Sequence, residues 1–303
     1  MSERMLKRLV GALAVVVAIW AVTSLFSDDS GSIQASGEIT GFFDGLDAQT
    51  VSVVRIDGPD GVAELVRTND GWTSNGFRAD GYAITELIGV VEGAQIGGLV
   101  ATNPSNHDRM GVSADSAITV VFEGDGEPRT ILIGKRGRAF ATSYVRLPGE
   151  DEVFLLDADL QAQVIRRLES WRDRTMIALD TAMVSTLSIE RGGSEYTLRR
   201  ADGSWTLEGG GVADQRVVDA VLSELSGLVA TGFLIEGDSI SSFEREGVLR
   251  AYSASGNELA DVSLGGGGGD RWARTSGDDY IYRVSSFRIA RVLPTREDLE
   301  PSS

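Results

Sequence analysis

The sequence VSVVRIDGPDGVAELVRTNDGW at residues 51–72 recurs in outline as VSTLSIERGGSEYTLRRADGSW at residues 184–205. In each copy, two runs of alternating apolar and polar residues flank a short turn that contains glycine, and a tryptophan closes the block. Alternation with a period of two predicts β-strands, and the short turn predicts that they form a hairpin. Because the two blocks are equally long and keep valine first and tryptophan last, we infer an internal duplication.

Further matching segments follow each hairpin in the same order. Asp80 and Asp214 each precede an apolar run with helical spacing, which predicts an amphipathic helix with an aspartate N-cap. A closing helix is predicted from about Ala158 to Trp171 and again from Ser286 to Leu293. The other matched pairs are Gly111-Val112 with Gly247-Val248, Ile131–Gly134 with Val262–Gly265, and Tyr144–Arg146 with Trp272–Arg274.

The order of the predicted elements defines the fold class. Strands occur in runs and do not alternate with helices, so the pattern predicts an α+β protein with antiparallel sheets and not a doubly wound nucleotide-binding fold. We expect two tandem repeated lobes, at residues 51–172 and 180–293, each an antiparallel sheet with two helices. One N-terminal transmembrane helix precedes them in this prediction.

The N-terminus carries the predicted membrane anchor. Residues 9–26 contain no charge, and a helix of that length comes close to the hydrocarbon thickness of a bilayer. Basic residues in the segment 1–8 precede the run, whereas Asp28 and Asp29 follow it. The positive-inside rule therefore predicts a single-pass protein of the inner (cytoplasmic) membrane with its N-terminus in the cytoplasm and its body in the periplasm or outside. A cleaved signal peptide is the alternative.

Two segments are predicted to lack regular structure. Residues 27–50 are rich in serine, glycine and aspartate, which is typical of a flexible tether between a membrane and a domain. Phe42 and Phe43 in this segment could dock on the body or on the membrane surface. The tail at residues 294–303 begins with a proline that stops the preceding helix, and we expect it to be disordered.

Composition restricts the classes of function. The 303 residues carry a net charge of −17, which argues against a nucleic-acid partner because phosphate binding needs a cationic face. The chain has no cysteine and a single histidine, His107, so thiolate chemistry and multi-histidine metal sites are excluded. We therefore predict no catalytic residue, no cofactor and no metal, and we expect the protein not to be an enzyme. A hydrolase that uses carboxylates remains a weaker hypothesis.

Four repeated residues are candidate contacts for a partner or ligand. Trp72 and Trp205 could form an aromatic platform, although packing of each hairpin against its helix explains their repetition better. Arg146 and Arg274 each lie in a predicted strand before an acidic turn. They could bind an anionic group, but a cross-strand ion pair with the carboxylates of that turn is the preferred interpretation.

The remaining candidate contacts are Lys135, Arg136 and Arg138, which form a compact basic cluster on an acidic body. A hairpin tip exposed to solvent is the simplest explanation of this cluster. The alternative is a contact with an acidic partner or with anionic lipid headgroups.

These ordered segments resemble a bacterial family, the domain of unknown function 4340. The resemblance rests on V-x-V-x-x-I, a turn and L-V-R before G-W, then A-D, R-M-G-V, I-L-I-G, S-Y-V-R, V-F-L-L and W-R-D-R, and covers roughly residues 50–175. It recurs more loosely to about residue 293. It implies one N-terminal transmembrane segment, an extracytoplasmic body and an association with the ATP-binding and permease subunits of ABC transporters related to gliding-motility systems.

Two functional hypotheses follow. The first is a non-catalytic, membrane-anchored extracytoplasmic accessory subunit that works with an ABC transporter and contacts the bilayer through residues 9–26. The second is an extracytoplasmic binding module that holds an envelope glycan, lipid or peptide in a cleft between the repeats.

Overall fold

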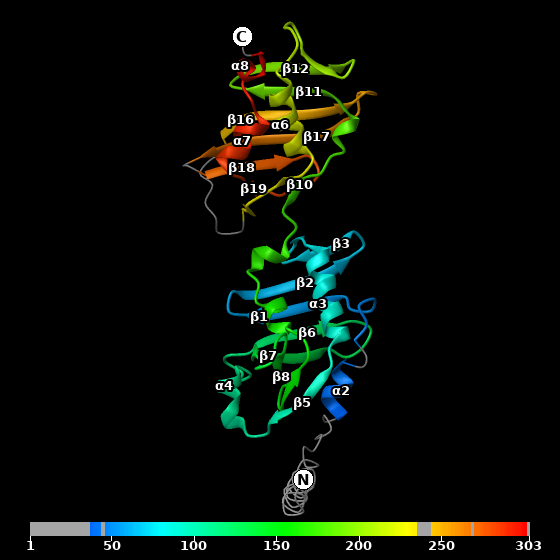
Figure 1. Ribbon diagram of the computed structural model, residues 1–303, viewed down its shortest axis with the longest axis vertical. Helices are drawn as coiled ribbons and strands as arrows, with labels where there is room; N and C mark the ends of the chain where they lie inside the picture. Colours follow the sequence, from blue (N-terminus) through cyan, green and yellow to red (C-terminus); the bar gives the residue numbers. More distant parts are fainter. Residues whose placement is uncertain (1–36, 44–45, 235–243, 268–269, 302–303) are drawn as a thin grey trace, which may run out of the picture. The chain divides into compact units, whose positions relative to one another are not determined.

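The computed structural model describes residues 37–43, 46–234, 244–267 and 270–301 (Figure 1). The chain divides into two compact units, unit 1 up to Arg172 and unit 2 from Asp173. Two large antiparallel sheets and their helices make an α+β protein, which confirms the predicted fold class. The predicted cytoplasmic segment 1–8 and anchor 9–26 lie outside the described residues. No helix within the described ranges is long and apolar enough to cross a membrane.

Unit 1 contains a nine-stranded sheet in the spatial order β4-β3-β2-β1-β6-β7-β8-β9-β5. Each neighbouring pair is antiparallel. The strands are β1 (Val53–Gly58), β2 (Gly61–Thr68), β3 (Gly71–Ser74), β4 (Phe77–Arg78), β5 (Ile96–Ala101), β6 (Ile118–Glu123), β7 (Arg129–Arg136), β8 (Ser143–Arg146) and β9 (Val153–Leu156).

The helices of unit 1 are α2 (Gly37–Phe43), α3 (Gly81–Gly93), α4 (His107–Met110) and α5 (Leu160–Val164), with 3-10 turns η1 (Pro104–Asn106) and η2 (Leu168–Trp171). The predicted N-cap of α3 is confirmed, because the Asp80 carboxylate accepts hydrogen bonds from the backbone amides of Tyr82 and Ala83. The apolar face of α3 is buried in one hydrophobic core with alternate residues of the strands.

Unit 2 contains an eight-stranded antiparallel sheet in the order β13-β12-β11-β16-β17-β18-β19-β15, and a two-stranded sheet of β10 and β14. The strands are β10 (Thr175–Ile177), β11 (Val184–Arg191), β12 (Ser194–Ala201), β13 (Ser204–Leu207), β14 (Leu228–Val229), β15 (Gly232–Phe233), β16 (Glu244–Ser253), β17 (Glu258–Gly267), β18 (Asp270–Thr275) and β19 (Tyr282–Arg283). The helices are η3 (Thr181–Met183), α6 (Gln215–Leu225), α7 (Ser286–Val292) and α8 (Arg296–Leu299). Asp214 caps α6 as predicted.

The two large sheets have the same strand order apart from β4, whose place in unit 2 is taken by an isolated bridge between Thr206 and Val212. Their registers also correspond. Asp57 in β1 lies opposite Thr119 in β6, and Glu190 in β11 lies opposite Val248 in β16. These pairs fix which residues of β6 and β16 are equivalent, and Val248 therefore corresponds to Thr119.

This register corrects one predicted match. The sequence predicts that Gly111 corresponds to Gly247, but Gly111 ends helix α4 in the left-handed conformation, whereas Gly247 lies inside β16 opposite Arg191. Since Val248 corresponds to Thr119, the true counterpart of Gly247 is Ile118.

The predicted tether is partly structured. Residues 37–43 form α2, and its side chains Ile39, Phe42 and Phe43 are buried in the core of unit 1. Arg129 Nη1 donates hydrogen bonds to the carbonyl oxygens of Gly41 (3.0 Å) and Phe42 (2.8 Å), which hold the end of the helix. The expectation of a flexible tether is therefore wrong for this part, because apolar residues spaced as i, i+3 and i+4 form a helix face that packs on the sheet.

The predicted disordered tail is also wrong over its described part. Thr295 and Asp298 form a reciprocal capping box at the start of α8, and Leu299 is fully buried. The backbone amide of Asp214 donates to the carbonyl oxygen of Leu299 (2.8 Å), and the Tyr196 hydroxyl donates to that of Pro294. Pro294 ends one helix, but the chain then folds back onto unit 2.

The closing helix predicted from Ala158 to Trp171 is shorter than expected. It begins after Asp159, whose side chain caps it, and ends at Val164; η2 follows separately. The apolar spacing continues through Leu168 and Trp171, but the backbone leaves the helical conformation at Ile165 and Arg167, with ψ of 78° and 145°. Leu168 and Trp171 therefore pack on the core from a separate turn. The second closing helix, α7, ends at Val292, close to the predicted position.

Candidate functional site

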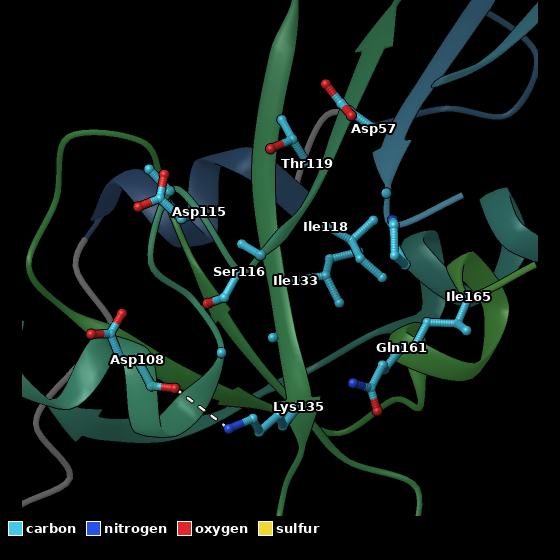
Figure 2. A pocket seen from close by; sticks show the side chains of 16 residues that line it. Asp57, Asp108, Asp115, Ser116, Ile118, Thr119, Ile133, Lys135, Gln161 and Ile165 are labelled. Carbon is cyan, nitrogen blue, oxygen red and sulfur yellow. Dashed lines mark hydrogen bonds between the residues drawn. The ribbon is translucent and has the colours of Figure 1, made fainter. Parts of the chain in front are cut away.

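Unit 1 contains an open pocket of about 470 Å³ at one end of its sheet. The pocket lies beside the end of β1, the start of β6 and the end of β7, and residues of α4, α5 and the loop 111–117 complete its lining. Figure 2 shows the carboxylates of Asp57, Asp108 and Asp115 lying apart around the pocket. A volume of this size lies in the range typical of sites for small molecules or single side chains of a partner.

The floor of the pocket is apolar. Ile118 and Ile133 are buried members of the unit 1 core and reach the pocket from adjacent strands. Ile165, directly after α5, extends the apolar surface and is 50% exposed. An exposed isoleucine beside a buried apolar floor offers a surface for the aliphatic part of a ligand.

The loop 111–117 forms one wall, and two glycines permit its path. Gly111 has a φ of +72°, a backbone conformation that favours glycine. Gly134 lies beneath this loop in β7, where a Cβ atom would be only 2.5 Å from the carbonyl oxygen of Met110. The R-M-G-V and I-L-I-G motifs therefore meet at a point of close backbone contact.

Two basic side chains hold the same wall in place. Lys135 Nζ donates to the carbonyl oxygens of Asp108 (3.4 Å) and Arg109 (3.1 Å) at the end of α4. Arg146 Nε donates to the carbonyl oxygen of Val112 (2.9 Å), and its Nη1 donates to that of Glu150 (2.7 Å). Burial lowers the pKa of the Arg146 guanidinium, and the nearby Asp151 carboxylate partly offsets this shift.

The polar groups of the pocket are mainly acceptors. Among the described residues, the carboxylates of Asp57, Asp108 and Asp115 have neither a salt bridge nor a hydrogen-bond donor, and the Gln161 side-chain amide has no hydrogen-bond partner. No group of three or more histidine and acidic side chains in the described ranges is arranged to hold a metal ion. The site is therefore best described as an acidic rim over an apolar floor.

The basic cluster predicted from the sequence is divided by the structure. Lys135 lines the pocket. Arg136 forms an ion pair with Asp159 (Nη2 to Oδ2, 2.7 Å), which also caps α5. Arg138 is exposed in the β7–β8 loop, two residues before Phe140, which is 99% exposed.

The two repeated tryptophans have structural surroundings. Trp205 is buried in unit 2, where its backbone amide and carbonyl are both bonded to the Gln215 side chain. Trp72 is half-buried against the core of unit 1, and the Arg67 guanidinium lies 4.8 Å from the centre of its ring. Trp205 therefore has no free face for a ligand.

The two repeated arginines differ between the units. Arg146 is buried and bonds to two backbone carbonyls, so the preferred interpretation of an ion pair with the carboxylates of the acidic turn is corrected. Arg274, its counterpart in β18, is exposed. His107 is also structural: its Nε2 lies 3.0 Å from the carbonyl oxygen of Asp151, and the side chain is buried.

Sequence reasoning did not find the acidic rim. Asp57 follows the last apolar residue of β1, and Asp115 lies in a loop with no recognised motif. Their association depends on where β6 begins, which a single sequence does not reveal. The only available signal was the repeat itself, which places Asp57 in register with Glu190.

The fold and site define an α+β protein with two similarly ordered sheets and an open, acidic pocket in one of them. Residues 72–245 match the family described as domain of unknown function (DUF4340). This match spans more than half of the chain, and the protein belongs to that family. Searches of curated proteins and of solved structures find no match.

Proposed function

We propose that the protein is a non-catalytic, membrane-anchored accessory subunit that works with an ABC transporter at the extracytoplasmic face. Membership of the DUF4340 family supports this proposal through the resemblance described above. The two similarly ordered sheets support an origin by duplication, with both lobes acting as positioning scaffolds. The partners are the permease and ATPase subunits and the bilayer around residues 9–26.

The docking of α2 on unit 1 is the observation that carries this proposal. Residues 27–36 are the only ones between the end of the apolar run at Phe26 and the start of α2. Ten extended residues reach at most about 35 Å. If residues 9–26 span the bilayer, unit 1 is held within that distance of the membrane surface, where the outer loops of a permease lie.

Co-purification tests the association. The full chain, tagged at its C-terminus, is extracted from its native membrane in mild detergent, and an unrelated single-pass protein with the same tag is the control. The expected result is recovery of the permease and ATPase subunits with this chain and not with the control. Absence of both subunits, with expression of the tagged chain verified, would overturn the proposal.

A binding module is the second candidate, and the pocket in unit 1 favours it. A rigid wall, an apolar floor and unpaired acceptors are typical of a site that holds a ligand without reacting with it. The two candidates are compatible, because an accessory subunit can bind the substrate or a segment of the transporter.

A further inference from the structure

The repeat places one carboxylate at the same position in both sheets. Asp57 follows Ile56 in β1, and Glu190 follows Ile189 in β11. Each is opposite an equivalent residue in the next strand, Thr119 or Val248. The surroundings of these two carboxylates can therefore be compared directly.

In unit 2 this carboxylate is neutralised by an arginine of the same chain. Arg245 Nη2 lies 3.0 Å from Glu190 Oε1. Arg245 lies three residues before Val248, with a β-bulge between Arg245 and Gly247. β6 begins at Ile118, so unit 1 has no strand residue at that place, and Ser116, three residues before Thr119, is the nearest match by chain position. Ser116 Oγ instead bonds to Ser113 Oγ (2.7 Å), and no described residue donates to the Asp57 carboxylate.

A difference in strand length explains the missing arginine. β16 begins at Glu244 and includes Arg245, whereas β6 begins only at Ile118. The residues before Ile118 leave the sheet as the loop 111–117 and open the pocket. In unit 2, Leu293 packs against Gly247, the counterpart of Ile118, at 2.9 Å from where a Cβ would lie.

The charge and shape of the unit 1 pocket suit an arginine side chain. The lining of the pocket carries three carboxylates and one ammonium group. The ammonium group belongs to Lys135 and already donates hydrogen bonds to carbonyl oxygens of α4. The isoleucine floor can pack against the methylene groups of an arginine side chain while its guanidinium reaches the rim. Arg146 holds the loop 111–117 and Lys135 holds the end of α4 that precedes it, so binding needs little reorganisation.

We propose that the unit 1 pocket binds a guanidinium group supplied from outside this chain, in the manner in which Arg245 binds Glu190 in unit 2. The ligand class is an arginine side chain, either in a peptide segment of a partner protein or in a free arginine derivative. This proposal goes beyond the association with a transporter and does not depend on it.

Binding is measured with the full chain in nanodiscs of uncharged phosphatidylcholine, using a fluorescein-labelled Gly-Arg-Gly peptide and fluorescence anisotropy. Saturable binding is expected, with competition by arginine amide but not by citrulline amide, its uncharged analogue. If the peptide binds with an affinity at least about tenfold higher than that of arginine amide, the guanidinium comes from a protein segment. If the two affinities are equal, the ligand is a free arginine derivative. Absence of binding, or equal competition by citrulline amide, would overturn the proposal.

Two variants locate the site. Asp57→Asn removes the charged acceptor and is expected to weaken binding at least about tenfold, since a charge-assisted hydrogen bond is lost. Asp60→Asn is the matched control, because Asp60 is exposed in the adjacent turn and does not line the pocket. Equal weakening by both variants would contradict the assignment.

A third variant supplies a guanidinium group from this chain itself. Ser116→Arg places an arginine three residues before Thr119, as Arg245 lies three residues before Val248. Because Ser116 is exposed, the variant is expected to fold. It should raise the midpoint of thermal unfolding and abolish peptide binding by occupying the pocket. A variant that binds the peptide as the wild type does would show that the pocket is not the guanidinium site.

Discussion

The buried guanidinium of Arg146 donates a hydrogen bond of 2.9 Å from Nε to the carbonyl oxygen of Val112. Val112 lies in the loop that forms one wall of the pocket, and Arg146 lies in the sheet beneath it. In unit 1, the arginine retained at the same place in both repeats therefore fixes this loop.

Removal of this side chain is expected to loosen the pocket wall. Arg146→Ala should lower the free energy of unfolding of unit 1 by about 1.5–3 kcal/mol, because it removes hydrogen bonds from a charged donor to two carbonyl oxygens. Urea denaturation measures the loss, and hydrogen exchange should increase over residues 110–117. Arg274→Ala, at an exposed position, should change stability by less than about 0.5 kcal/mol. Equal losses in the two variants would contradict this role.

The docking of α2 is tested by Phe42→Ala. Phe42 is buried and packs edge-on against Phe122 at 6.3 Å between ring centres, so its truncation should destabilise unit 1 by about 3–5 kcal/mol. Chemical denaturation measures this loss, and α2 should lose protection from hydrogen exchange. Phe140→Ala is the control, since that ring is 99% exposed and its loss should be nearly neutral. A mild effect of Phe42→Ala would mean that α2 is not part of the core.

The C-terminal helix is expected to stabilise unit 2. Leu299 is fully buried, and Leu299→Ala should cost about 2–5 kcal/mol through lost burial and a residual cavity. The denaturation midpoint of unit 2 should fall while that of unit 1 is unchanged. Arg296→Ala on the same helix is the control for a surface position. If removing the Leu299 side chain has no larger effect than the control, the tail contributes nothing to the fold.

The capping box of α8 predicts a dependence on pH. Hydrogen bonds from the Thr295 hydroxyl and backbone amide lower the pKa of Asp298. The carboxylate therefore stabilises unit 2 fully above the pKa of an unfolded aspartate, about 3.9, and this contribution is lost as the pH falls through the lower folded-state pKa.

Urea denaturation between pH 5 and about pH 2.5 measures this effect in the wild type and in Asp298→Asn. The stability difference between them should shrink as the pH falls, because protonation removes the wild-type advantage. Glu297→Gln is the control, since Glu297 is exposed on the same helix and no described side chain bonds to it. A difference between wild type and Asp298→Asn that stays constant with pH would contradict the prediction.

Local signals in the sequence were sufficient for the regular elements. Asp80 and Asp214 carry the N-cap chemistry, and the apolar residues after them have helical spacing, so α3 and α6 form where expected. The repeat also predicted that the two halves share an arrangement of strands. Both features depend on residues close together in the chain, where propensity and capping act directly.

Features that depend on distant packing were not predictable in this way. Whether Ile39 and Phe42 form a docked helix depends on their packing in a core that includes Phe122 and other residues far along the chain. The Thr295 and Asp298 pair is a readable capping signal, but the preceding Pro294 is itself a signal that ends a helix. The pocket arises from the late start of β6 compared with β16, and no residue type marks that difference.

The shared strand order also has a consequence for how the chain folds. Two sheets with corresponding registers in one polypeptide are competing pairing partners, and misassembly between similar neighbouring domains is a characteristic failure of repeated architectures. Synthesis from the N-terminus reduces this risk. Every strand of the first sheet, up to Leu156 in β9, is complete before Val184 begins the second. Early pairing of the first sheet thus occupies its inner strands before the second is made, which leaves only the edge strands β4 and β5 open to wrong pairing.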